Sequence, residues 1–156
     1  MPSPMKKLPV LSLRVLLGAV FLVSGFQKLT TPYQNFAAVI EKFDLLPASA
    51  VPVLAQTLPW AEFILGVFLV LGLWERLSLA GLWAMNTVFI AAIVSALARK
   101  LPIESCGCFG EAVPLTLPKI LALDVSLWAF FLLFFLTHRR LDLPGLDRHF
   151  RPHAGR

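Results

Sequence analysis

The chain of 156 residues is 58% hydrophobic and only 15% charged, with a formal net charge of +5 at pH 7. Soluble domains hold about 45–50% apolar and about 25% charged residues, so this composition excludes an ordinary cytosolic globule and a disordered chain. It indicates an integral membrane protein. The basic balance does not indicate a nucleic-acid partner, because the cations lie at the ends of apolar runs, where membrane proteins use them to set orientation.

Four apolar runs predict four transmembrane helices, since each is close to the roughly 20 residues that cross a bilayer. The runs cover residues 8–26, 54–73, 77–97 and 117–136. We therefore expect an all-α fold: one membrane domain over the whole chain, built as a four-helix bundle in the lipid bilayer, with a basic tail at 137–156. The second and third helices form a tight hairpin, and the two longer connections lie together on the opposite side.

The start of the chain resembles a signal peptide, because Lys6 and Lys7 precede an apolar run. The run ends without a small-residue cleavage motif at the right distance, so we expect an uncleaved first helix. Most Lys and Arg residues lie toward the side of the two termini. The positive-inside rule then predicts cytoplasmic termini and extracytoplasmic long loops in a bacterial inner membrane.

Small residues recur within two of the predicted helices. Gly18 and Gly25 are a heptad apart in the first helix, and the third helix carries a stripe of small residues, Ala80, Ala84, Ala91 and Ser95. Small residues let helix backbones approach closely in lipid. We therefore predict that both sets form helix-packing surfaces.

Three polar residues lie at similar depths in different predicted helices. Measured from the predicted inner helix ends at about 1.5 Å per residue, Glu62, Asn86 and Asp124 are all roughly 14–18 Å deep. Ionisable groups within a membrane usually face the bundle interior, so these residues are expected to meet near the midplane. Lys28, at the outer end of the first helix, either joins this buried polar cluster or snorkels into lipid head groups. Snorkelling is the favoured interpretation for Lys28, and for Arg14 at the inner end.

The buried polar cluster has two interpretations. Interhelical hydrogen bonding is slightly favoured. The alternative is a polar pocket that binds a quinone-like head group or relays protons, so a quinone is the cofactor class to consider.

The most specific motif joins the third and fourth helices, where Cys106 and Cys108 flank Gly107 and are followed by Phe109 and Gly110. Two thiols separated by one residue can close a small, strained disulfide ring that is easily reduced. Glycine supplies the backbone freedom that such a ring needs. A structural staple explains the pair less well, because a small ring constrains little of the unfolded chain. No metal is expected, because two cysteines do not fill a tetrahedral shell.

This cysteine motif and two helix segments, SGFQKL (24–29) and LPWAEFILG (58–66), resemble the MauE branch of the DoxX-like membrane proteins. The likeness covers nearly the whole chain. It implies a four-helix bundle associated with thiol redox chemistry in the periplasm. It also implies a thioredoxin-like partner or a disulfide-rich extracytoplasmic client, because the namesake member is needed to mature the disulfide-rich small subunit of methylamine dehydrogenase.

Three functions follow from these features. The first is thiol-disulfide exchange by Cys106 and Cys108, which would make the protein an oxidoreductase or a redox maturation factor. The second is a non-redox assembly factor that docks a partner through the same loop. The third is a quinone or small-solute carrier built on the buried polar cluster. Dependence on the cysteines separates the first hypothesis, which we prefer, from the other two.

Overall fold

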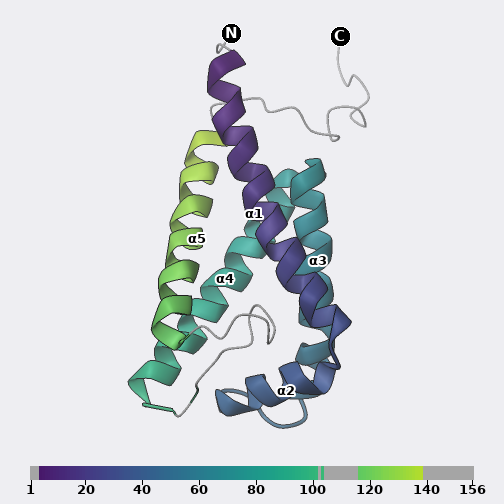
Figure 1. Cartoon of the computed structure of the whole chain (residues 1–156), viewed down its shortest axis with the longest axis vertical. Coiled ribbons are helices and arrows are strands. Elements are labelled where there is room, and N and C mark those ends of the chain that lie inside the picture. Colours follow the sequence, from purple (N-terminus) through teal and green to yellow (C-terminus); the bar gives the residue numbers. More distant parts are fainter. Residues whose placement is uncertain (1–3, 102, 104–115, 139–156) are drawn as a thin grey trace.

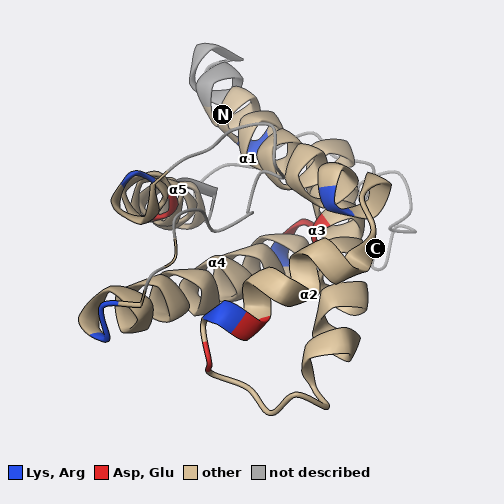
Figure 2. Ribbon diagram, turned by 60° about the horizontal axis from the view of Figure 1, so that its bottom comes forward, with Lys and Arg blue, Asp and Glu red and all other residues tan. Residues whose placement is uncertain are grey.

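The computed structural model describes residues 4–101, 103 and 116–138. In this part of the chain there are five helices and no strands, which confirms the all-α class. The helices are α1 (Pro4–Thr30), α2 (Tyr33–Lys42), α3 (Val51–Leu71), α4 (Glu75–Ala98) and α5 (Leu117–His138). All but α2 are long and apolar enough to span a membrane, and charged residues are sparse along them (Figure 2). The four predicted spans are therefore confirmed.

The long helices all run between the two ends of the molecule, with α1 and α4 inclined to the long axis in opposite directions (Figure 1). The start of α1, the turn between α3 and α4, and the end of α5 lie at one end, and α2 lies at the other. The turn is as tight as predicted. Gly72 ends α3 with a φ of 70°, a left-handed conformation that glycine adopts at little cost.

The short helix α2 was not predicted, because its residues belong to the connection expected between the first two spans. Its 10 residues are too few to cross a bilayer. Phe36 is buried against the bundle, whereas Tyr33, Glu41 and Lys42 are exposed. An amphipathic helix across the end of a membrane bundle is suited to the membrane interface.

Helices α1 and α3 pack closely because three glycines remove side chains from their crossing. A Cβ atom on Gly25 would lie 2.7 Å from the backbone nitrogen of Phe63, and one on Gly66 would lie 2.7 Å from that of Leu22. A Cβ on Gly18 would lie 2.7 Å from Val70 Cγ2. The predicted packing role of the heptad glycines is confirmed.

The corresponding prediction for α4 is wrong. Ala80, Ala84 and Ala91 are exposed on the outside of the bundle, and Ser95 is only half-buried. The inner face of α4 instead carries larger buried residues, among them Leu82 and Ile93. Burying these larger apolar side chains brings more contact with neighbouring helices than burying alanine would.

The apolar core consists of two clusters. The first fills the end of the bundle that holds the α3–α4 turn, and Leu17, Leu82 and Phe134 are among its fully buried members. The second lies at the α2 end and includes Ile93 and Ile120. Polar side chains lie between these clusters and form the site described next.

Candidate functional site

Five buried polar side chains form a layer across the bundle, which we call the polar layer. Its members are Ser24 and Lys28 of α1, Glu62 of α3, Asn86 of α4 and Asp124 of α5. In α4 and α5 these residues fall between members of the two apolar clusters, and in α1 and α3 they lie on the α2 side of the first cluster. The exposed fractions run from 0% for Glu62 to 8% for Asp124, so every long helix contributes a buried polar group.

An ion pair between Lys28 and Glu62 is the centre of the polar layer. The ammonium of Lys28 donates to both carboxylate oxygens of Glu62 at 2.8 Å and to the hydroxyl of Ser24 at 3.2 Å. Ser24 in turn donates to Glu62 Oε2 at 3.2 Å. Lys28 is 5% exposed, so the expectation that it snorkels into head groups is wrong: a buried carboxylate offers its ammonium a stronger partner.

The glycine crossing explains how this pair forms. Gly25 follows Ser24 directly, and a Cβ there would meet the backbone of Pro59 and Phe63 at 2.9 and 2.7 Å. Those two residues flank Glu62 in α3. The missing side chain at Gly25 therefore lets α3 approach α1 at the level where the carboxylate reaches Lys28.

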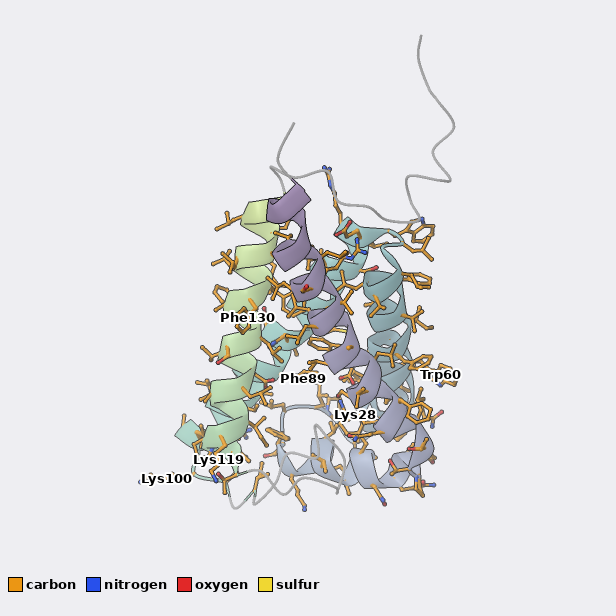
Figure 3. The ribbon with its side chains drawn as sticks, turned by 45° about the horizontal axis from the view of Figure 1, so that its top comes forward. Lys28, Trp60, Phe89, Lys100, Lys119 and Phe130 are labelled. Atoms are coloured by element: carbon orange, nitrogen blue, oxygen red, sulfur yellow. The ribbon has the colours of Figure 1, made fainter. Side chains whose placement is uncertain are left out.

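Two aromatic rings complete the surroundings of the Lys28 ammonium. Its Nζ atom lies 5.0 Å from the ring centroid of Phe36 and 5.4 Å from that of Phe89, within the roughly 6 Å range of cation–π attraction. Lys28 and Phe89 face the same interior region, whereas Trp60 and Phe130 lie on the outside (Figure 3). Sequence reasoning missed Ser24 and both rings; the four-residue spacing of Ser24 and Lys28, which puts them on one helix face, was the available signal.

Asn86 and Asp124 extend the polar layer to α4 and α5. Asn86 Nδ2 donates to the backbone oxygen of Asp124 at 3.2 Å, and Asp124 lies within electrostatic reach of both Lys28 and Glu62. Asn86 Oδ1 and Asp124 Oδ2 are buried without a hydrogen-bond partner among the described residues. The layer therefore has acceptor oxygens to spare, which a water molecule or a ligand with donor groups could use.

An apolar cavity of about 350 Å³ adjoins the polar layer on the α2 side. Phe36 and Phe89, the two rings that contact Lys28, form part of its wall. The remaining wall comes from α2, the segment after it, α3 and α4, and Ser95 contributes its one side-chain hydroxyl. This volume is at the lower end of the roughly 300–1,000 Å³ of small-molecule sites.

A second buried ion pair involves Arg14, in the first half of α1. Arg14 Nη1 is 3.6 Å from Glu75 Oε1, in the first turn of α4. Arg14 is 4% exposed, so the snorkelling interpretation is wrong for this residue as well.

The predicted reactive loop is not part of the described structure: Cys106, Gly107, Cys108, Phe109 and Gly110 lie outside the described residues. Within the described residues no group of three or more His, Cys, Asp and Glu is arranged to hold a metal ion.

The helix ends that precede and follow the loop are described. Helix α4 ends at Ala98 and α5 begins at Leu117. Lys100 and Lys119 lie near these ends, on the same side of the molecule (Figure 3).

A comparison with protein-family models gives a match to the methylamine utilisation protein MauE over residues 6–137. This range includes all four spans, the polar layer and both cysteines. The chain belongs to the MauE family. It is accordingly a multi-pass membrane protein of a family involved in methylamine utilisation. Searches of the curated proteins and of the solved structures each found no match.

Proposed function

We propose that this MauE family member exchanges thiols and disulfides with an extracytoplasmic client through Cys106 and Cys108. The observation that supports this most directly is the placement of the chain's only two cysteines. They lie in the segment between α4 and α5, and the adjoining ends of both helices are at the α2 end of the bundle (Figure 1). The four spans would thus anchor a reactive loop at one membrane surface.

The side of the membrane follows from charge. The end of the bundle opposite α2 carries the start of α1 and the end of α5, next to which most of the Lys and Arg residues fall in the sequence. The positive-inside rule places that end in the cytoplasm of a bacterial cell. The cysteine loop then faces the oxidising extracytoplasmic space, where disulfides persist.

The described residues that border the loop in the sequence include two lysines and the start of a helix. The N-terminus of α5 carries the positive end of a helix dipole, and Lys119 lies in its first turn. Lys100 follows the end of α4. These charges would stabilise a thiolate, the nucleophile in disulfide exchange, only where the loop brings a cysteine beside them.

The exchange proceeds in two steps. When a client is oxidised, a client thiolate attacks one sulfur of the Cys106–Cys108 disulfide and the other sulfur leaves as a thiolate. A second client thiolate then attacks the mixed disulfide, so the client loses two electrons and the cysteine pair gains them. Reduction potentials decide the direction. Because the chain has no second pair, a thioredoxin-like protein or a quinone must return the pair to its starting state.

The test is to trap the mixed disulfide. Cys106→Ser and Cys108→Ser variants are expressed separately in the native host and analysed on non-reducing gels. The variant that lacks the resolving cysteine should accumulate a reducible adduct of higher mass that the other variant forms weakly. The double variant is the matched control and should form none. Two single variants without adducts, both of which support normal maturation of extracytoplasmic disulfides, would contradict the proposal and favour a non-redox assembly factor.

A second candidate is a quinone or small-solute carrier, and one observation favours it for a ligand with donor groups, such as the quinol form or a hydroxylated solute. Asn86 Oδ1 and Asp124 Oδ2 are buried acceptors without partners in the described part of the chain, beside a cavity of ligand size. The two functions separate in the same host assay. A carrier should lose function in Asp124→Leu and keep it in the double cysteine variant, whereas the exchange function predicts loss in the cysteine variant.

A further inference from the structure

We infer that the polar layer binds one exchangeable proton, which the carboxyl group of Asp124 carries while Lys28 is paired with Glu62. This proton site does not depend on the cysteine exchange proposed above, nor on a carried solute. Its evidence is the number of charges in the layer, the use of the donor hydrogens of Lys28, and the acceptor oxygens that have no donor.

The polar layer contains two acids and one base. Lys28 contributes one positive charge, and Glu62 and Asp124 would contribute two negative charges if both were ionised. Among the described residues, the charged groups that act on Asp124 are Lys28 of α1 and Glu62 of α3, while α4 meets Asp124 with the neutral amide of Asn86. With both acids ionised, one buried carboxylate would therefore have no counter-charge.

The ammonium of Lys28 is fully used by its present partners. An ammonium has three donor hydrogens, and Lys28 donates to both oxygens of Glu62 at 2.8 Å and to the hydroxyl of Ser24 at 3.2 Å. Hydrogen bonds from a cation stabilise the ionised form of the carboxylate that accepts them. Glu62 is therefore the acid that holds the negative charge.

Asp124 has no such support. Its side chain is buried at 8% exposure, and its Oδ2 atom has no hydrogen-bond partner in the described part of the chain. A buried charge without a partner is costly, above all within a membrane, and a bound proton removes that charge. One proton on Asp124 brings the net charge of the layer to zero.

The proton also supplies a donor that the layer lacks. Asn86 Oδ1 is a second buried acceptor without a partner among the described residues, and the amide of Asn86 is held against Asp124 by its bond to the backbone oxygen. As a neutral acid, Asp124 has an O–H group that can donate to Asn86 Oδ1, directly or through a water molecule. A single hydrogen thus answers both unpartnered oxygens.

The pairing of Lys28 decides which acid holds the proton. Lys28 acts on Asp124 as well as on Glu62, so an ammonium that leaves Glu62 favours an ionised Asp124. The O–H bond of Asp124 then breaks, and its proton passes to the carboxylate of Glu62, which has lost its cation. The layer keeps one proton, and that proton moves from α5 to α3.

Infrared spectroscopy of the detergent-purified full chain tests the inference, because the C=O stretch of a neutral carboxyl group is separate from the bands of a carboxylate. At neutral pH we expect a neutral carboxyl band that shifts in deuterium oxide and is absent from Asp124→Asn. The double cysteine variant should keep this band, which separates the outcome from that of the exchange proposal. A wild type without a band that shifts in deuterium oxide would overturn the inference, whether or not Asp124→Asn folds.

Two further variants test the control by Lys28. Glu62→Gln leaves the ammonium to act on Asp124 alone, so the band should weaken at least about tenfold, a change that requires about 1.4 kcal/mol of added attraction. Lys28→Met removes the cation, so Glu62 should also take up a proton and a second band should appear.

Two comparisons assign these bands. The second band should disappear when Glu62→Gln is added to Lys28→Met. A wild-type band that persists in Asp124→Asn and is lost in Glu62→Gln would overturn the assignment to Asp124. A band of unchanged strength in Glu62→Gln would contradict the control by Lys28.

Discussion

Two buried ion pairs join α1 to neighbouring helices, and they differ in length and in surroundings. Lys28 and Glu62 are 2.8 Å apart, with Ser24 and two aromatic rings around the ammonium. Arg14 and Glu75 are 3.6 Å apart. The two cations are separated by 14 positions, about 21 Å along the helix, so each pair can be changed without touching the other.

The difference indicates separate tasks. Glu75 lies in the first turn of α4, where the helix dipole favours a carboxylate, and its contact with Arg14 ties α1 to the helix that follows the tight turn. This is the arrangement expected of a structural contact between helices. The Lys28 pair is fully surrounded and borders spare acceptors and a cavity, although ionisable groups are expensive within a membrane. Such an environment is typical of a functional site.

The largest expected effect comes from breaking the Lys28 pair. Glu62→Leu leaves the Lys28 ammonium buried without its carboxylate and should lower the free energy of unfolding by about 3–5 kcal/mol. Glu62→Gln should lower it less, because the amide oxygen still accepts from Lys28 and Ser24. Denaturant titration in detergent, followed by circular dichroism, measures both variants.

A double variant is the control for this experiment. Lys28→Met with Glu62→Leu removes both charges and should be more stable than Glu62→Leu alone, since no buried charge remains unpaired. If Glu62→Leu were as stable as the wild type, Lys28 would have another partner or would reach water in the membrane-embedded protein.

A smaller loss of stability is expected from substitutions at the glycine crossing of α1 and α3, whose glycines Gly18 and Gly25 lie between Arg14 and Lys28 in α1. Gly25→Ala forces a methyl group against the α3 backbone at Pro59 and Phe63, beside Glu62. Overpacking of this kind lowers stability by about 1–3 kcal/mol. Gly18→Ala meets the side chain of Val70 first, and a backbone oxygen at 3.0 Å, so it should lower stability less.

The same two glycine variants show whether the crossing sets the geometry of the Lys28 pair. Gly25→Ala should weaken the pair, so that adding Glu62→Gln to it has a smaller effect than Glu62→Gln alone. Gly18→Ala should leave the effect of Glu62→Gln unchanged. Equal coupling in both would show that the crossing does not position Glu62.

The four spans could be predicted from the sequence because length and hydropathy decide whether a helix crosses a bilayer. Depth along each predicted helix also brought Asn86 and Asp124 to one level, and a hydrogen bond joins them in the structure. The depth of a residue along its helix does not tell which way its side chain points around the helix axis. Lys28 and Arg14 turn inward, and only the placement of α1 against α3 and α4 reveals their carboxylate partners.

The two sets of small residues make the same point. Gly18 and Gly25 were predicted correctly because glycine has a specific use where backbones meet. Ala84 and its neighbours were predicted wrongly, since alanine is apolar enough to face lipid as readily as protein. Helix α2 was missed for another reason: 10 residues within a longer connection carry too weak a pattern to separate a surface helix from a loop.

The smallest expected effect is at the Arg14 pair, and it tests the division of tasks directly. Glu75→Gln keeps the size and hydrogen-bonding capacity of the side chain but removes its charge, so the ion pair and the favourable interaction with the α4 dipole are lost. We expect stability to fall by about 1 kcal/mol, because the atoms are farther apart than in the Lys28 pair and Glu75 is 9% exposed.

The Glu75→Gln variant should still support maturation of extracytoplasmic disulfides in the native host. Glu62→Gln should impair this maturation more than its loss of stability explains. Unfolding and host activity measured on both variants decide the matter. If Glu75→Gln lowered stability and host activity as much as Glu62→Gln does, the two pairs would be equivalent structural contacts. That result would contradict a functional role for the polar layer.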